Sequence, residues 1–271
     1  PMDVGLNVEQ YKEGWSKAKE NTSSGKSGMH FGHCKAGANH PGIGRFDAIM
    51  ANIPYQTGHA PPRWKKAISV MFQKKKDKHD VESTRTILLM EPDFNQNNKR
   101  TGRATMTSAE DHQTLAREQY GSRKSHSAID HCLNKRLTFD IIRQKRIPGA
   151  HLASDAVSCY DRIVHSVASL AMRAQGVPAG PIVSMFTTLQ EMDHYIRTVY
   201  GDSQISFQSK NHRKKIPIQG VGQGNGAGPQ IWAVVSSPVL EMLRTAGCLC
   251  IFRMAITGED VEFVGYAFVD D

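Results

Sequence analysis

Two acidic segments, far apart in the chain, carry residues that could do chemistry together. The first is Asp155-Ala-Val-Ser-Cys-Tyr-Asp161, where Asp155 is expected to end a short apolar strand. The second is the pair Asp270-Asp271, which follows the apolar run 263–269. A carboxylate at the end of a buried strand is costly unless it is paired or bound to a cation. Strand-end carboxylates that hold two divalent cations roughly 3.5–4 Å apart would suit in-line nucleotidyl transfer.

A glycine-rich segment lies between them. Residues 219–228 contain five glycines in ten positions, and Pro229 follows. Such a segment allows the backbone to approach a flat or polyanionic partner closely, and the proline suits the first turn of a helix. The segment lacks the Gly-Lys-Ser/Thr of a phosphate-binding loop. The triplet Gly25-Lys26-Ser27 is rejected as such a loop because Glu20 stands where its first glycine is needed. His30, His33 and Cys34 lack a second ligand pair at zinc spacing.

The order and content of these segments resemble a reverse transcriptase of the non-LTR (LINE-like) retrotransposon class. Asp155–Asp161 resembles that family's Asp-x-x-x-Ala-Phe-Asp block, and Phe268-Val-Asp-Asp271 resembles its Tyr/Phe-x-Asp-Asp box. Gly220–Pro229 resembles Gly-Val-Pro-Gln-Gly-Ser-x-Leu-Ser-Pro, with Gly222 and Gly228 as departures. Further resemblances lie upstream, in Glu118–Asp130, in Pro62-x-Trp64-Lys65 and in Arg85-Thr86-Ile87.

The resemblance spans about residues 60–271 and implies an RNA-directed DNA polymerase, a nucleotidyltransferase that extends a DNA primer on an RNA template. It implies that the catalytic residues are Asp155, Asp270 and Asp271, and that the metal is held by Asp155, Ala156, Asp270 and Asp271. It also implies that the nucleotide is bound by Tyr160, Gln223, Gly224, Lys65 and Arg85, and that the template is bound by Arg123 and Lys124. The implied cofactors are two Mg²⁺ ions, with Mn²⁺ as a substitute. The implied partners are RNA, a DNA primer and deoxynucleoside triphosphates, and the implied place is the nucleus or cytoplasm.

The expected fold is α+β, with the fingers and palm of a right-hand polymerase and no thumb. The chain starts without methionine and stops at the acidic pair, so we expect a fragment. The expected parts are a polar segment, 1–45, fingers with the first part of the palm, 46–150, and the palm, 151–271. Helices are expected near 8–20, 63–72, 125–145, from 161, 181–192 and 229–245. Extended runs are expected at 84–90, 151–155 and 261–268, a hairpin at 195–208, and loops over most of 1–45 and 95–103.

Charge is distributed unevenly along the 271 residues. Residues 1–150 hold 25 Lys and Arg against 15 Asp and Glu, whereas residues 151–271 hold 9 against 11. A basic first half suggests that it holds a polyanion, although a solvated basic surface explains the composition equally well. The five scattered cysteines argue against a secreted disulfide scaffold. No apolar run approaches the ~20 residues of a membrane span, and no signal peptide is recognisable.

Two alternatives to a reverse transcriptase stay open. An RNA-templated RNA polymerase shares paired acids on a similar palm, but the bulk of Tyr160 disfavours a substrate with a 2′-hydroxyl. A decayed, inactive retroelement fragment would at most bind nucleic acid through its basic half. The survival of all three acids does not separate these alternatives.

Overall fold

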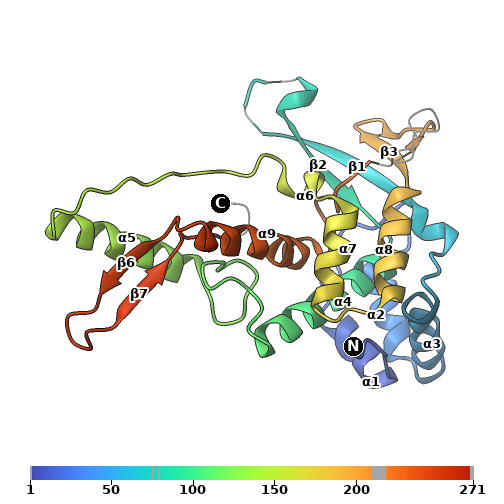
Figure 1. The fold of residues 1–271 in the computed structure, drawn as a ribbon. Coiled ribbons are helices and arrows are strands. Elements are labelled where there is room, and N and C mark those ends of the chain that lie inside the picture. Colours follow the sequence, from blue (N-terminus) through green and yellow to red (C-terminus); the bar gives the residue numbers. More distant parts are fainter. Residues whose placement is uncertain (1, 75, 79, 209–217, 269–271) are drawn as a thin grey trace.

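The described part of the chain has a mixed α+β fold. The structure is a computed structural model that describes residues 2–74, 76–78, 80–208 and 218–268, except for the side chain of Glu82. Within these ranges it contains nine α-helices, a five-stranded mixed sheet and a two-stranded hairpin (Figure 1). The helices are α1 Val8–Ser16, α2 Phe31–Asn39, α3 Pro41–Thr57, α4 Pro92–Asp111, α5 Ala128–Gln144, α6 Cys159–Arg162, α7 His165–Ala174, α8 Ala179–Gln190 and α9 Gly228–Thr245. Two short 3₁₀ helices are η1 Pro62–Lys65 and η2 Val81–Ser83.

The main sheet joins strands from both halves of the chain. Its order is β2-β1-β3-β4, and β5 also pairs with β3. The central strand β1 runs antiparallel to β2 and parallel to β3. The strands are β1 Lys66–Gln73, β2 Thr84–Leu89, β3 Asp193–Thr198, β4 Gly201–Asp202 and β5 Phe207–Gln208, and the hairpin consists of β6 Cys250–Arg253 and β7 Asp260–Phe263. The sheet therefore links the segments 46–150 and 151–271 that the sequence analysis treats separately.

Two apolar clusters hold the body of the molecule together. The larger cluster joins β1 and β2 to α4, α7, α8 and α9, and it contains Trp64, Phe94, Met172 and Met185. The smaller cluster joins α1, α2 and α3 below the sheet in Figure 1. Helix α1 buries Tyr11 and Trp15, four positions apart on one face.

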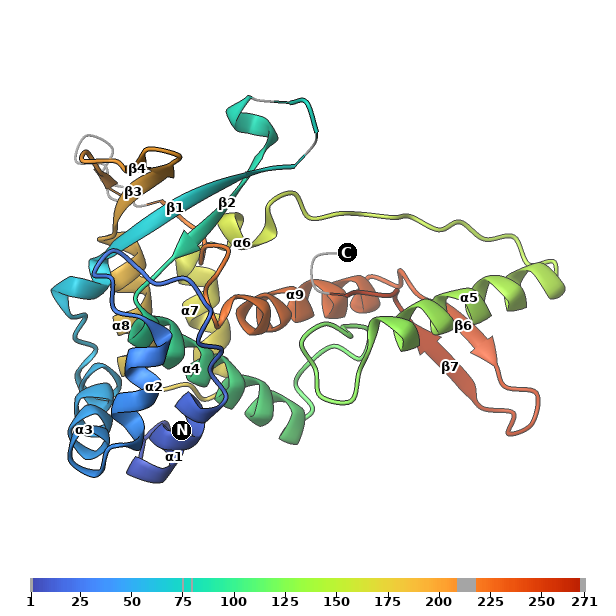
Figure 2. The same cartoon turned by 180° about the vertical axis from the view of Figure 1, so that it is seen from behind.

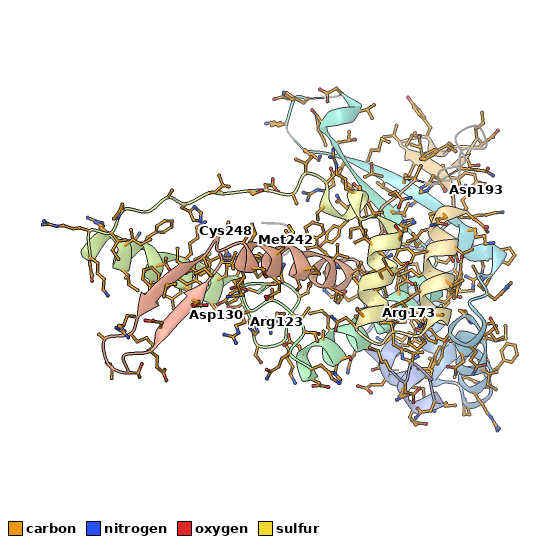
Figure 3. The ribbon with its side chains drawn as sticks, in the orientation of Figure 1. Arg123, Asp130, Arg173, Asp193, Met242 and Cys248 are labelled. Carbon is orange, nitrogen blue, oxygen red and sulfur yellow. The ribbon has the colours of Figure 1, made fainter. Side chains whose placement is uncertain are left out.

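An arm extends from this body. Helix α5 and the β6–β7 hairpin project away from the sheet, and residues 145–158 run back from the end of α5 to α6 (Figures 1 and 2). Helix α5 buries none of its residues. Helix α9 reaches from the body towards the arm, where Met242 is 64% exposed (Figure 3). The arm thus has few of the buried apolar contacts that stabilise the body.

Much of the expected secondary structure is confirmed. The helices predicted near 8–20, 125–145, 181–192 and 229–245 correspond to α1, α5, α8 and α9. The helix expected from Asp161 is split into α6 and α7. The run 84–90 contains β2, and the hairpin expected at 195–208 is formed by β3, β4 and β5. Of the run 261–268, only the part up to Phe263 is a strand.

Four predictions are wrong, each for a physical reason. Residues 66–72 form β1 rather than a helix, because hydrogen bonding to β2 and β3 on both sides overrides the helical spacing. Residues 31–45 are mostly helical, in α2 and the start of α3. Residues 95–103 lie inside α4, whose buried face is largely small and polar, so hydropathy hides its period. Residues 151–155 form no strand, since no strand of the described chain pairs with them.

Among the described residues, no helix combines the length and apolar character needed to cross a membrane.

Candidate functional site

The glycine-rich segment is fixed between α6 and β2. The Val221 N–H donates to the Tyr160 carbonyl at 2.8 Å, and the Gly220 N–H donates to the Ile163 carbonyl at 2.8 Å. On the other side, the Leu88 N–H of β2 donates to the Gln223 carbonyl at 2.7 Å. Two of the segments that carry the resemblance, at residues 155–161 and 220–229, therefore meet in space, and the second of them is bonded to Leu88, the residue directly after Arg85-Thr86-Ile87.

Glycine is required here by contacts within the chain. Gly224 has φ +113°, and a Cβ built on it would lie 2.5 Å from the Leu88 carbonyl oxygen. Gly222 has φ +73°, which the ring of a proline cannot adopt. The replacement of the family's usual proline by Gly222 is therefore consistent with this backbone. The sequence predicted that these glycines allow close approach to a partner; the partner seen in the structure is β2.

His165 orients the first turn of the glycine-rich segment, and sequence reasoning missed it. Its side chain is 3% exposed, with Nε2 2.6 Å from the Gly220 carbonyl and Nδ1 3.0 Å from the Gln190 Nε2. The Gln219 Oε1 accepts from the His165 backbone N–H at 2.8 Å. Burial lowers the pKa of His165, so the ring is neutral, donating from Nε2 and accepting at Nδ1. A lone histidine at a helix start gives no sequence signal for this role.

A cavity of about 240 Å³ opens beside this junction. It is lined by residues of β1, β2, α6, α8, β3, β5 and the glycine-rich segment, namely Ser69, Thr86, Leu88, Asp161, Leu189, His194, Phe207, Ile218, Gln219, Gly220, Gly222 and Gln223. Asp161 supplies the only carboxylate among these lining residues. Partial burial raises its pKa, while the Lys74 ammonium opposes this shift. We call this space the junction cavity.

The predicted catalytic acids do not line the junction cavity in the described chain. Asp155 is exposed on a segment without regular secondary structure, and the neighbouring Ala156 is half-buried. Asp270 and Asp271 lie outside the described residues. Within the described ranges, no group of three or more His, Cys, Asp or Glu side chains is arranged to hold a metal ion. The described residues alone therefore do not make a Mg²⁺ site.

The predicted nucleotide-binding residues have different surroundings. Gln223 lines the junction cavity, whereas Gly224 lines a separate hollow described below. Tyr160 is half-buried and packs against the larger apolar cluster, with its ring facing Gly228. Arg85 is exposed on β2. The Lys65 ammonium forms an ion pair with Glu191 at 2.6 Å.

The two predicted template-binding residues also differ from each other. Arg123 donates two hydrogen bonds to Glu110, both at 2.7 Å, and further ones to the carbonyls of Ala116 and Gln119. Its guanidinium therefore holds the turn after α4 to that helix. Lys124 is exposed next to it. Template contact by either residue stays a prediction.

A basic hollow of about 300 Å³ lies on the far side of the glycine-rich segment. Lys17, Lys19 and Lys99 line it together with the backbone of Gly224 and Gly226. Burial lowers the pKa of Lys99, and the positive charges of Arg103 and Lys19 lower it further. Lys17 is paired with Glu13 at 2.6 Å, whereas Lys19 and Lys99 form no ion pair with a side chain of the described residues, which favours an anionic partner.

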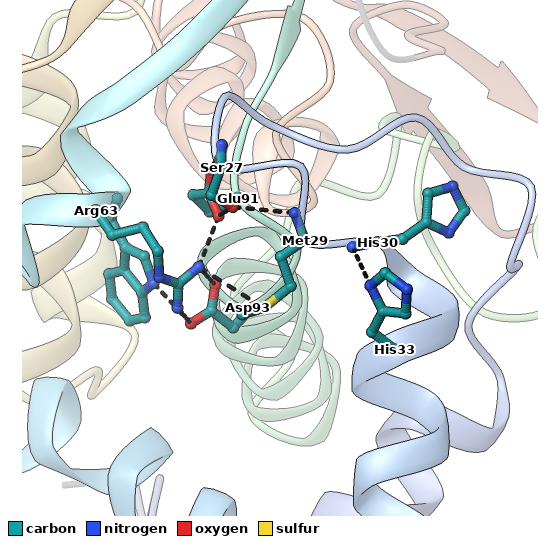
Figure 4. A network of polar contacts seen from close by, with 8 residues as sticks. Ser27, Met29, His30, His33, Arg63, Glu91 and Asp93 are labelled. Carbon is teal, nitrogen blue, oxygen red and sulfur yellow. Dashed lines mark hydrogen bonds and ion pairs between the residues drawn. The ribbon is translucent and has the colours of Figure 1, made fainter.

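The Gly25-Lys26-Ser27 triplet has a structural role. The Ser27 hydroxyl donates to the fully buried Glu91 carboxylate at 2.6 Å. Arg63 joins that carboxylate to Asp93, with ion pairs at 2.6 and 2.5 Å (Figure 4). The N-terminal segment is thereby fastened to the start of α4. This agrees with its rejection as a phosphate-binding loop.

Comparisons with known proteins do not decide the family. No model of a protein family matches the chain, and no curated protein matches its sequence.

Proposed function

We propose that this chain is the fingers and palm region of an RNA-directed DNA polymerase that extends a DNA primer on an RNA template. The observation that carries the proposal is the meeting of three sequence blocks at one junction. These blocks are separated by about 60 to 130 positions in the chain. Backbone hydrogen bonds nevertheless join Tyr160 to Val221, and Gln223 to Leu88, the residue directly after Arg85-Thr86-Ile87. Sequence blocks that contribute to one active site must lie close together in the folded chain, whereas chance motif matches need not.

The junction cavity is the proposed place of the incoming deoxynucleotide. Its walls combine backbone from the glycine-rich segment with apolar and aromatic side chains, a lining typical of small-molecule sites. Gln223, on the cavity wall, is suited to contact the pair formed by template base and nucleotide. Tyr160 lies next to Gly228 and is not among the residues that line the cavity.

The basic hollow is the proposed contact for the nucleic-acid backbone. It shares the glycine-rich segment with the junction cavity, so a strand held by Lys19 and Lys99 would run close to the bound nucleotide. Phosphate contacts of this kind give affinity that depends on salt and little on sequence.

Mg²⁺ belongs to the proposal as a cofactor that the family resemblance implies. Asp155, with Asp270 and Asp271 outside the described residues, would have to supply the ligands. When bound, Mg²⁺ would stabilise charge on the transferred phosphates.

Nucleic-acid binding without polymerisation is a second candidate. It is favoured by the basic hollow together with the exposed position of Asp155 away from the junction cavity.

Primer extension by the 271-residue chain on a poly(rA)–oligo(dT) substrate with Mg²⁺ separates these candidates. We expect incorporation of dTTP that Asp155→Asn reduces to below roughly a tenth of the parent rate, because a carboxylate needed for catalysis is lost. Primer–template affinity should be unchanged. Asp111→Asn, at an exposed carboxylate at the C-terminal end of α4, is the matched control and should keep full activity.

Three results would count against the proposal. Extension by Asp155→Asn near the parent rate contradicts the assignment of this acid. A parent that prefers UTP to dTTP favours an RNA polymerase. A parent that binds primer–template tightly without extending it favours the binding-only candidate.

A further inference from the structure

A second cavity, of about 310 Å³, lies among the N-terminal helices, away from the junction cavity. Tyr11 and Trp15 of α1 and Trp64 of η1 form its inner wall, and all three are buried. Phe46 and Met50 of α3 line its mouth, where they are 61% and 47% exposed. Aromatic and thioether side chains therefore form part of both the inner wall and the mouth of the cavity. We call it the aromatic cavity.

The aromatic cavity is lined by two carboxylates, those of Asp47 and Asp93, and by two guanidinium groups, those of Arg63 and Arg100. Asp47 and Asp93 both line it, and the pKa of Asp47 is raised by burial and then by the Asp93 charge. Burial raises the pKa of the Cys34 thiol to about 12, and Asp93, Asp47 and Glu91 contribute to the rise while Arg63 opposes it. Burial also raises the pKa of Tyr11, with Asp47 as the next cause. Burial is the main cause of the raised pKa of both Cys34 and Tyr11, and the neighbouring carboxylates add to it.

The two carboxylates differ in their partners. Asp93 accepts from Arg63 and from the Trp64 indole N–H at 2.9 Å, so its charge is compensated (Figure 4). Asp47 has no ion pair with any basic side chain of the described chain, and its hydrogen-bonding partner is the Tyr11 hydroxyl. A partly buried carboxylate without a cation is unfavourable unless something else supplies the positive charge.

Arg100 also lines the cavity but does not neutralise Asp47. Its Nη2 donates to the carbonyls of Val4 and Gly5, at 2.9 and 2.5 Å, and the guanidinium lies over the Tyr55 ring. These contacts use Nη2 and the face of the guanidinium, whereas the buried Nη1 has no hydrogen-bond partner among the described residues.

We propose that the aromatic cavity binds an alkylated ammonium group, with Asp47 as its counter-ion and the aromatic side chains as its walls. Aromatic faces attract cations, and quaternary ammonium groups are recognised by aromatic cages of this composition. A metal ion or a simple phosphate would gain nothing from Trp15, Trp64 and Phe46. The volume matches a small head group, the lower end of ligand pockets being about 300 Å³.

Two sources present this head group: a free molecule of the choline type, and a trimethyllysine side chain in a peptide. The exposed positions of Phe46 and Met50 leave the mouth open to either. Separate titrations with choline and with a short trimethyllysine peptide identify the source. The ligand that the mouth accommodates should have the lower Kd.

Isothermal titration of the full chain with choline tests the proposal, with 3,3-dimethyl-1-butanol as the neutral isostere. We expect choline to bind at least about tenfold more tightly than the alcohol, because only the cation gains from Asp47 and the aromatic faces. Asp47→Asn should weaken choline binding about tenfold and abolish the preference over the alcohol. Phe46→Ala, at an exposed position, should weaken binding without affecting folding.

Asp111→Asn, at an exposed carboxylate at the other end of α4, is the matched control and should bind choline as the parent does. The proposal is overturned if choline and the alcohol bind equally, or if neither choline nor the peptide binds at about 10 mM, a concentration that would reveal even a millimolar Kd. Unchanged choline affinity in a folded Asp47→Asn protein overturns it as well. None of these outcomes bears on polymerase activity, which depends on other residues.

Discussion

The basic hollow and the aromatic cavity lie beside the same helix, α4, and both are lined by Gln96. Their volumes are nearly equal, about 300 and 310 Å³, but their chemistry differs. The basic hollow is lined by lysines and glycine backbone, whereas the aromatic cavity combines aromatic rings with two carboxylates and two guanidinium groups. A net charge of +8 for the chain therefore does not describe either site. Local placement decides which partner each site favours.

Their neighbours suggest different uses. The basic hollow includes Gly224 and Gly226, so it adjoins the junction cavity and shares its proposed role. The aromatic cavity is built from α1, α2, α3, η1 and α4, and none of the glycine-rich segment lines it. Perturbing the glycine-rich segment should therefore affect one site and leave the other unchanged.

The largest effect is expected for Gly224→Ala. The added Cβ would lie 2.5 Å from the Leu88 carbonyl oxygen at a backbone conformation that alanine rarely adopts, so we expect a loss of about 3 kcal/mol in unfolding free energy. Gly201→Ala is the matched control, since φ is +109° there but no atom lies within 4 Å of the added Cβ. Its cost should be about 1 kcal/mol.

Urea denaturation of both variants measures the difference. In the surviving folded fraction, Gly224→Ala should lose nucleic-acid affinity but keep choline binding. Equal destabilisation by the two substitutions would show that the contact with β2 is unimportant.

The next largest effect is expected for the double variant Lys19→Gln with Lys99→Gln. Removal of two phosphate contacts should weaken single-stranded RNA binding by roughly tenfold and lower the slope of log affinity against log salt by nearly 2. Lys124→Gln serves as the comparison, because Lys124 is a predicted template contact outside the basic hollow. A larger loss of RNA affinity for Lys124→Gln would show that the strand binds outside the basic hollow.

A smaller effect concerns Asp47 and pH. Because burial and the Asp93 charge raise the pKa of Asp47 in the folded protein, Asp47 takes up a proton above the usual range of an aspartate, and choline binding should weaken as the pH falls towards that range. The unfolded chain gives up this proton at lower pH, so charged Asp47 opposes folding at neutral pH. Asp47→Asn should therefore unfold at or above the parent temperature at pH 7. A clear decrease in its melting temperature would show that Asp47 is a structural partner instead.

The smallest effect is expected for His165→Gln. The pKa of His165 is lowered, so the unfolded chain binds the extra proton first, and stability should decrease as the pH falls through the ordinary value of about 6.5. Removal of the imidazole should reduce the decrease in unfolding free energy between pH 7 and pH 5. Denaturant midpoints at the two pH values measure it. An identical decrease in the variant would assign the effect to His194, whose pKa burial also lowers.

The sequence predicted elements whose own residues determine them. Helix α5 begins with the capping box of Ser127 and Asp130, and α9 begins at the glycine-proline step, both of which are local signals. Strand β1 was missed because the hydrogen bonds that define it come from residues up to about 125 positions away. Helix α4 was missed because Asn97, Thr101 and Thr105 replace the apolar residues that a buried face usually carries.

For the candidate site, the sequence predicted the segments better than the side chains. The glycine-rich segment and the start of α6 meet, and Gln223 lines the junction cavity. Arg123 instead forms an ion pair with Glu110, and Lys65 forms one with Glu191. Both pairs depend on tertiary packing. The aromatic cavity has no signal in the sequence, because its residues come from four separate helices and η1.

The central claim is that a deoxynucleotide occupies the junction cavity, and photo-crosslinking tests it most directly. The 271-residue chain would be irradiated with an azido-substituted dUTP, digested and mapped by mass spectrometry. The account predicts crosslinks in residues 86–88, 161 and 218–223, competed by dTTP and lost with Gly224→Ala. Crosslinks confined to the aromatic cavity, or spread over the basic surface without competition by dTTP, would contradict it.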